Sequence, residues 1–258
     1  MLPFDDRGAR AIERVYSTPD VVAQRAEVLA LLAAGPGERV LDVGSGPGFL
    51  VASLADAVGP DGAVRGLDPS PAMNALARER TADLPQARID DGDAADLPYP
   101  AASFDAAVST QVYEYVADVP RALAELRRVL RPGGRVLVLD TDWDSVVWHV
   151  ADRERHRRVM AAWAEHLVDP HLPCTLSGHL RRAGLRVTGR SVIPVFNPVY
   201  EPQTYSAMTM ETIARFVTGR CGLTADDADA WLADLRARAA EDDYLFSITR
   251  YCFTAVAD

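Results

Sequence analysis

The sequence predicts a doubly wound α/β fold, in which a mostly parallel sheet carries helices on both faces. Short apolar runs, such as 39–43, 63–68 and 104–109, alternate with helical segments, and this alternation is typical of βαβ units. A glycine-rich turn follows the first run, and Asp68 ends the second. Because such folds bind ligands at the carboxyl ends of their strands, these features predict a binding site there.

The elements follow in order along the chain. Helices are expected at 9–34 (with a break at Ser17-Thr18-Pro19), 49–58, 70–81, 120–130, 144–167, 176–183 and 210–239. Strands are expected at 39–43, 63–68, 87–89, 104–109, 135–140, 185–196 and 244–256. Since no repeat or linker interrupts them, we expect one domain, 1–258, with a helical cap at 1–37, a ligand-binding core at 38–140 and substrate-side elements at 141–258.

Composition excludes several classes of protein. The net charge of −10 argues against a nucleic-acid partner. All 27 basic side chains are arginines, so a P-loop lysine or a lysine Schiff base is excluded. The segment 1–6 lacks the features of a signal peptide and no apolar run is long enough to span a bilayer. These observations predict a cytoplasmic protein with no membrane span; they leave the oligomeric state unknown.

Three distant cysteines, Cys174, Cys221 and Cys252, show no metal-ligand spacing. We therefore expect no metal site and interpret these thiols as buried apolar groups. The histidines at 156, 166, 171 and 179 also lack ligand spacing and are interpreted as structural or exposed.

The sharpest signal is the turn Asp42-Val43-Gly44-Ser45-Gly46-Pro47-Gly48-Phe49. Glycines allow a tight turn and close approach of a ligand to the backbone, and the helix that follows offers free amide groups. A dinucleotide fingerprint counted from Gly44 would need glycine at position 49, where Phe49 stands. Asp68 can accept hydrogen bonds from ribose hydroxyls, which by itself suits a nicotinamide cofactor equally well.

Two further segments complete the pattern: Gly92-Asp93-Ala94-Ala95-Asp96-Leu97-Pro98 before Phe104, and Leu130-Arg131-Pro132-Gly133-Gly134 before the strand at 135–140. Together with the glycine turn and Asp68, they resemble the ordered motifs of class I S-adenosylmethionine-dependent methyltransferases, in the branch of small-molecule and ubiquinone/menaquinone methyltransferases. The resemblance covers 38–140 and implies a Rossmann-like sheet of seven strands whose last strand runs antiparallel.

The resemblance also implies S-adenosyl-L-methionine as cofactor, S-adenosyl-L-homocysteine as product and a small-molecule acceptor methylated at O, N or C by in-line displacement. It implies that Asp93 faces the adenine amino group and that Ala94 faces the adenine ring. Tyr16 and Arg25 resemble a cap over the cofactor in some relatives, or else belong to a surface helix. The other residues implied in cofactor binding are Asp42, Gly44, Ser45, Gly46, Gly48, Asp68, Pro69, Met73, Ser109 and Gln111.

The acceptor side is expected in the loops after 104–109 and 135–140. Many relatives place a histidine after the fourth strand, but here Glu114 and Tyr115 stand there, as candidate catalytic groups. The alternatives are a solvated carboxylate for Glu114 and an amphipathic aromatic at the pocket wall for Tyr115. After the fifth strand, Asp142, Trp143, Asp144, Trp148 and His149 follow closely. Tryptophan and carboxylate together suit a flat or cationic acceptor, so Asp144 and His149 are further candidates. The alternative for Asp144 is a helix N-cap.

Other functions remain open at this point. Asn197-Pro198-Val199-Tyr200 is similar to a signature of nucleic-acid amino-methylating enzymes, but it follows the sixth strand and lacks the second proline. A nucleic-acid substrate is therefore rejected. An enzyme of the same fold that binds the cofactor but catalyses another reaction, such as a cyclisation, is the main alternative. A non-catalytic binding protein is a third.

Overall fold

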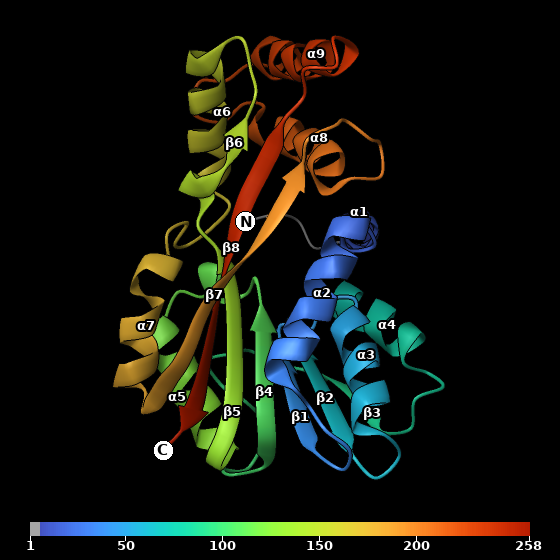
Figure 1. Cartoon of the computed structure of the whole chain (residues 1–258), viewed down its shortest axis with the longest axis vertical. Coiled ribbons are helices and arrows are strands. Elements are labelled where there is room, and N and C mark those ends of the chain that lie inside the picture. Colours follow the sequence, from blue (N-terminus) through green and yellow to red (C-terminus); the bar gives the residue numbers. More distant parts are fainter. Residues whose placement is uncertain (1–5) are drawn as a thin grey trace.

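A computed structural model describes residues 6–258 and shows an eight-stranded sheet with helices on both faces (Figure 1). The strand order is β3-β2-β1-β4-β5-β8-β6, and β7 pairs with the other edge of β8. The strands are β1 (Arg39–Val43), β2 (Ala63–Asp68), β3 (Ala87–Asp91), β4 (Phe104–Thr110), β5 (Leu130–Thr141), β6 (Val147–Trp148), β7 (Leu185–Asn197) and β8 (Phe246–Ala257). The predicted fold class is confirmed.

The sheet differs from the expected seven strands by one short addition. β1 to β5 pair in parallel, and the last strand, β8, runs antiparallel to β5, as predicted. The pairing of β5 with β8 ends at Thr141. Beyond this point the two residues of β6 pair with Phe246 and Ser247, at the start of β8. β6 therefore lengthens the ladder along β8 beyond the end of β5.

Each face of the sheet is covered because the central strands are apolar on both sides. β1 buries four consecutive residues, the pattern expected of a parallel strand between two helical layers. On one face lie α2 (Pro19–Leu32) and α3 (Phe49–Val58), and on the other lie α5 (Val119–Val129) and α7 (Pro173–Arg182). α4 (Pro71–Arg80) flanks β2 and β3.

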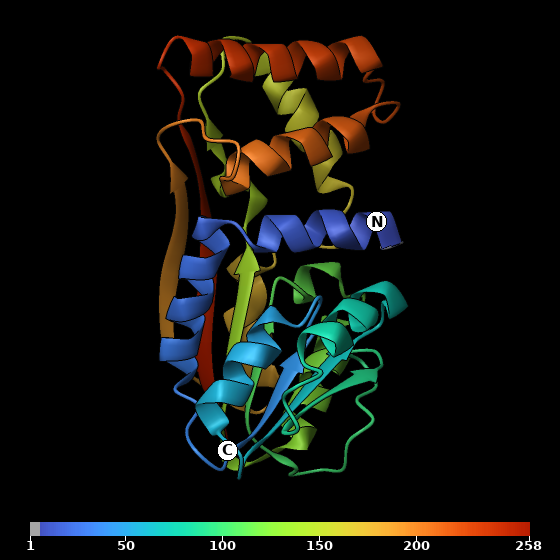
Figure 2. The ribbon, with the colours of Figure 1, turned by 90° about the vertical axis from the view of Figure 1, so that its right-hand side faces the viewer.

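A second group of helices stands beyond the carboxyl ends of β1, β4 and β5. It comprises α6 (Arg153–Ala164), α8 (Tyr205–Val217) and α9 (Ala225–Ala240), which share one apolar cluster with the end of β7 and the start of β8. Figure 2 shows α1 (Asp6–Tyr16) lying between this helical lobe and the sheet. α1 and α2 thereby cover the edge of the sheet where a ligand is expected.

Two element predictions after Asp140 are wrong. The helix expected at 144–167 is replaced by a 3-10 turn, η2 (Trp143–Ser145), then β6, and α6 begins only at Arg153 with Asp152 as its N-cap. The helix expected at 210–239 is two helices. Positive-φ glycines at 219 and 222 end α8, and a capping box of Thr224 and Asp227 starts α9.

Of the segment 1–6, interpreted above as lacking a signal peptide, residues 1–5 lie outside the described part of the chain. Within residues 6–258, none of the helices combines the length and the apolar character that crossing a bilayer requires.

Candidate active site

The glycine turn adopts a conformation that only glycine accepts readily. Gly44, Gly46 and Gly48 all have positive φ, at 72°, 50° and 79°. The amides of Gly44 and Ser45 donate to the carbonyl of Leu67 at 2.7 and 3.0 Å, which ties the turn to β2. A Cβ at Gly44 would collide with the side chain of Val112. The turn is therefore fixed from both neighbouring strands.

Asp68 holds the same turn through its carboxylate. Its Oδ2 accepts from the Gly46 amide at 3.0 Å, and its Oδ1 accepts from the Ser70 amide at 2.9 Å. Burial is the main cause that raises the pKa of Asp68, and the two amides oppose the shift. Each carboxylate oxygen retains a lone pair, so Asp68 can also accept from hydroxyl groups of a ligand lying against the turn.

Asp42 is the most unusual group in the site. Its side chain is 1% exposed, and neither carboxylate oxygen has a hydrogen-bond partner in the described part of the chain. Burial, together with the nearby Asp68, raises its pKa to about 8. A buried carboxyl group without a partner is costly. Asp42 therefore fits a ligand that brings a positive charge or hydrogen-bond donors to this point.

A cleft lies over Asp42 and the turn, and its empty space together with the adjoining open solvent is about 510 Å³. Its walls come from β1, the glycine turn, the end of β4 and the first two helices. The lining residues are Tyr16, Val21, Gln24, Arg25, Val28, Asp42, Gly44, Ser45, Pro47, Phe49, Leu50, Thr110 and Gln111. Thus Tyr16, Arg25, Asp42, Gly44, Ser45 and Gln111, all named from the sequence, share one cleft.

The two helices bring Tyr16 and Arg25 to the cleft as a pair. Nη2 of Arg25 donates to the carbonyl of Tyr16 at 2.8 Å, and its guanidinium lies 4.6 Å from the ring centroid of Phe49. Tyr16 lies over the turn, with its ring 3.8 Å from a Cβ built at Gly46. Burial raises the pKa of the Tyr16 hydroxyl to about 12, so it stays a neutral donor.

Gln111 follows β4 with a φ of +58°, which is rare for a residue other than glycine. Its amide donates to Leu139 at 2.6 Å, and its Nε2 donates to Oγ1 of Thr141 at 3.3 Å. Ser109, two residues earlier in β4, is buried, and its hydroxyl has no hydrogen-bond partner among residues 6–258. Strained backbone of this kind clusters at functional sites.

Eight other residues named from the sequence for the cofactor do not line this cleft. Gly46, Gly48 and Asp68 belong to the glycine turn and the end of β2 beside it, and Ser109 lies in β4. The remaining four lie outside these elements.

Asp93 is exposed and closes its own turn, because Oδ1 accepts from the Ala95 amide at 2.7 Å. Ala94 is buried in the core beside α5, and Pro69 is exposed. Met73 is buried against Ala9 of α1. They lie at or just beyond the carboxyl ends of β2 and β3.

Glu114 and Tyr115 lie in a 3-10 turn after β4, η1 (Tyr113–Tyr115). Glu114 is fully buried; Oε2 accepts from the Thr141 amide at 3.3 Å, while Oε1 has no partner in the described chain. Burial raises its pKa to about 7, and Arg250 opposes the shift. Burial, followed by the charge of Glu114, raises the pKa of Tyr115 well above its usual value.

Arg250 is a functional candidate that the sequence reasoning missed. It lies on β8, fully buried, with its guanidinium 4.9 Å from the ring centroid of Tyr205. Its charge acts on both Glu114 and Tyr16. We call Tyr16, Glu114, Tyr115, Tyr205 and Arg250 the polar cluster. The available signal was the alternation of β8, which places an arginine at a buried position.

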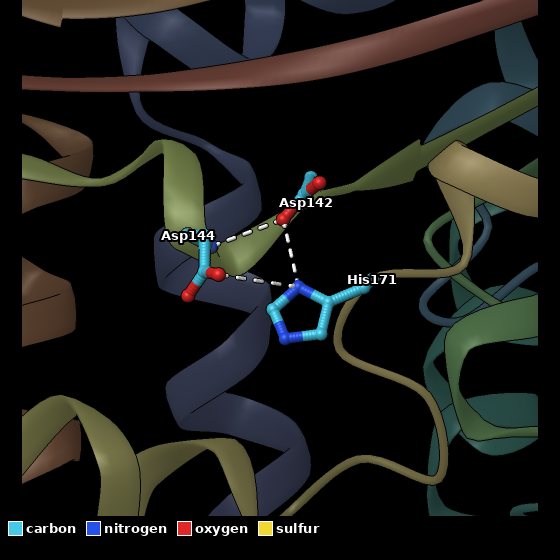
Figure 3. Close-up of side chains that lie close together, drawn as sticks. All are labelled: Asp142, Asp144 and His171. Carbon is cyan, nitrogen blue, oxygen red and sulfur yellow. Dashed lines mark hydrogen bonds and ion pairs between the residues drawn. The ribbon is translucent and has the colours of Figure 1, made fainter.

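The structure does not bring Asp144 or His149 to the polar cluster. Asp144 is 88% exposed, and Asp142, not Asp144, caps η2. Figure 3 shows Nδ1 of His171 beside both carboxylates, 3.0 Å from Asp142 and 3.8 Å from Asp144. These groups lie close enough to be a metal-ligand candidate, but ion pairing alone accounts for them. His149 instead lies 3.0 Å from the exposed Asp243.

The expectation of three buried thiols is wrong for two of them. Cys252 is buried in β8, whereas Cys174 and Cys221 are exposed and lie beside carboxylates, Asp142 at 3.2 Å and Glu165 at 2.8 Å. Neither exposed thiol lines the cleft.

Comparison with known sequences identifies the central part of the chain. Residues 41–138 match the family described as a methyltransferase domain. A 2-phytyl-1,4-naphtoquinone methyltransferase of Synechococcus elongatus is 45% identical over 111 residues, which cover 42% of this chain and 48% of that protein. The chain thus spans about half the length of the curated relatives that it matches.

Solved structures share the fold over the whole chain. Phosphoethanolamine N-methyltransferase 2 of Haemonchus contortus, in complex with S-adenosyl-L-methionine, superposes with a TM-score of 0.64 at 18% identity, covering 100% of this chain and 60% of that one. The 4+2 cyclase SpnF superposes with a TM-score of 0.59 at 24% identity, covering 91% and 80%. At these identities the likeness shows the fold alone.

Proposed function

This chain belongs to the class I S-adenosylmethionine-dependent methyltransferases, in the quinone-methyltransferase-like branch, and from that premise we propose that it methylates a small-molecule acceptor. The whole chain's activity is a proposal because the curated relatives match it over only about half their length. The observation that carries it is the unpartnered carboxylate of Asp42 beside a glycine turn tied to Asp68.

The residues present fit S-adenosylmethionine. Asp68 would accept from the ribose hydroxyls, and Asp42 would face the amino or sulfonium end, where its charge is unopposed. Arg25 and Tyr16 would close over the amino-acid part, and Gln111 with Ser45 would line the wall. Gly44, Gly46, Gly48 and Ser109 would shape the floor. We retain Asp93, Ala94, Pro69 and Met73 as adenine-side candidates because they lie at the neighbouring strand ends.

When bound, the cofactor supplies an activated methyl group and leaves as S-adenosylhomocysteine. The chain's own contribution is to align the acceptor, exclude water and receive a proton. Glu114 suits the role of receiving the proton because its pKa of about 7 lies near working pH. Tyr115 is proposed as a positioning group beside it. Asp144 and His149 have no part in this scheme.

Other features are proposed with the function. The cap at 1–37, the cofactor core at 38–140 and the acceptor side at 141–258 would act as parts of one domain in the cytoplasm. An acceptor other than nucleic acid fits the net charge of −10. The relative's printed name points to a quinone, but the acceptor-binding residues proposed here lie largely outside the family match at 41–138.

A non-methylating enzyme is the second candidate, since a cyclase shares this fold. Product mass separates the two functions: with isotopically labelled methyl on the cofactor, methyl transfer adds that label to the acceptor, whereas cyclisation leaves it on the cofactor. Recovery of an altered acceptor without the label would contradict the proposed function.

Glu114→Gln tests the proposed base on the same assay. We expect kcat to fall about 10²- to 10⁴-fold, with S-adenosylmethionine affinity unchanged, because the amide keeps the shape but cannot accept the proton. The wild-type rate should rise with pH through about 7, as the carboxyl group loses its proton. Glu241→Gln, at an exposed residue, is the control. An unchanged rate and pH profile in Glu114→Gln would exclude Glu114 as the base.

A further inference from the structure

We propose that the acceptor carries a carboxylate group and that the guanidinium of Arg250 binds it. This inference rests on the proposed function and deepens it by naming a chemical class of acceptor. It concerns the polar cluster, which lies next to the cofactor cleft and which the cofactor scheme leaves largely unused.

The guanidinium of Arg250 is fully buried, yet Nε, Nη1 and Nη2 all lack a hydrogen-bond partner among residues 6–258. No ion pair within 4 Å joins it to a carboxylate of the described chain. The ring of Tyr205 lies 4.9 Å from it. A buried charge in a folded protein is normally paired. The missing partner is therefore best supplied by a ligand.

The guanidinium lies near the cofactor cleft, although Arg250 does not line it. Arg250 of β8 pairs with Thr141 of β5, whose hydroxyl accepts from the cleft-lining Gln111 at 3.3 Å. On the other side its charge reaches the hydroxyl of Tyr16, which lines the same cleft. Arg250 is thus separated from the cleft-lining Gln111 by Thr141, and its charge also acts on Glu114.

The chemistry of the site favours a planar anion over other ligands. The five N–H donors of arginine form a flat fork that matches a carboxylate with two parallel hydrogen bonds. Three tyrosine rings, those of Tyr16, Tyr115 and Tyr205, form much of the surroundings, which suits an aromatic acid. Arg25, which lines the cleft, is the cation available to the cofactor's own carboxylate.

The test compares two probes that differ in charge. Protein saturated with S-adenosylhomocysteine is titrated calorimetrically with 4-hydroxybenzoate and with 4-hydroxybenzamide, which has the same shape but no charge. We expect the acid to bind at least about tenfold more tightly than the amide. Equal affinities, or no binding of the acid at millimolar concentration, would overturn the proposal.

Variants assign the effect to Arg250. Arg250→Gln should remove the preference for the acid, and Arg250→Lys should restore part of it, while S-adenosylhomocysteine affinity stays within about twofold. Arg220→Gln is the matched control, since Arg220 also lies over an aromatic ring, 4.2 Å from Phe216, but is exposed. Circular dichroism checks that each variant is folded.

The outcomes separate this inference from the proposed function. If S-adenosylhomocysteine does not bind the wild type, the proposed function itself is contradicted. If S-adenosylhomocysteine binds and both Arg250→Lys and Arg250→Gln keep the full preference for the acid, the carboxylate is bound by another residue. In that case only this inference fails. Loss of S-adenosylhomocysteine binding in folded Arg250→Gln would instead assign Arg250 to the cofactor and overturn it.

Discussion

The carboxyl group of Asp42 is buried with no hydrogen-bond partner among residues 6–258, an arrangement that costs stability. Its folded pKa, about 8, is raised above the unfolded value of about 3.9. The stability that the neutral form contributes is therefore complete below about pH 3.9 and is lost as the pH rises through 8. Glu114, raised to about 7, acts in the same direction.

Asp42→Asn should make the ligand-free protein more stable near pH 8, by a few kcal/mol, because the amide carries no buried charge. Its unfolding free energy should also depend less on pH between about 4 and 8 than that of wild type. Urea unfolding at several pH values measures both effects. Asp61→Asn, at an exposed residue, is the control. Parallel pH curves for Asp42→Asn and wild type would contradict this reading of Asp42.

At the scale of residues, the sequence predicted several of the residues that line the cleft, but it did not predict Arg250 of the polar cluster. The glycine turn and Asp68 are local features, and the strands and helices on either side of them can be predicted from the sequence. The burial of Arg250 is not a local feature, because it depends on the pairing of β8 with β5 and β7 and on Tyr205 of α8, all in segments more than 30 residues away. Asp144 and His149 look chemically rich in the sequence, yet they point to solvent.

At the scale of elements, the glycine turn is fixed by two separate constraints. Gly44 needs a positive φ of 72°, and it also lies against Val112, where a Cβ would collide. Gly37 has a similar φ of 80° but open space around its Cβ position. Alanine substitutions at Gly37 and Gly44 therefore separate the free-energy cost of backbone strain from that of steric collision.

Gly37→Ala should cost about 1 kcal/mol of unfolding free energy, the cost of the left-handed conformation. Gly44→Ala should cost more, about 2–4 kcal/mol, because Val112 and the turn must also shift, and it should weaken S-adenosylmethionine binding. Chemical unfolding and calorimetry give these values. Equal losses of stability in the two variants, with cofactor affinity retained, would refute the steric role of Gly44.

The prediction of a helix at 144–167 failed because strand pairing in the tertiary structure overrode the local helical pattern. Val147 and Trp148 were expected in a helix, but β8 offers a free edge beyond Thr141, and they pair with it. The sequence does contain the signals for a break between α8 and α9, namely Gly219, Gly222 and the Thr224–Asp227 capping box. The helical periodicity of the segments on either side outweighed these signals in the prediction of one helix. The parallel core was predictable because its strands and turns are short and strongly patterned.

At the scale of the whole molecule, the apolar core of the sheet and that of the helical lobe are separate clusters. One underlies the sheet, and the other fills the lobe of α6, α8 and α9. Asp20, near the start of α2, accepts from Asn197 of β7 at 2.8 Å and from the amide of Tyr205 in α8 at 2.7 Å. These hydrogen bonds join α2, the end of β7 and the start of α8 beside Tyr205 of the polar cluster.

Calorimetric titration of wild type and Asp68→Ala with S-adenosylmethionine tests the central claim most directly. We predict micromolar binding to wild type, about −8 kcal/mol, and a loss of about 2–3 kcal/mol in the variant, because Asp68 supplies charged acceptors to the ribose and also holds the Gly46 amide. Equal binding by both proteins would show that the cofactor lies elsewhere. No binding to wild type would contradict the assignment of the cleft to S-adenosylmethionine.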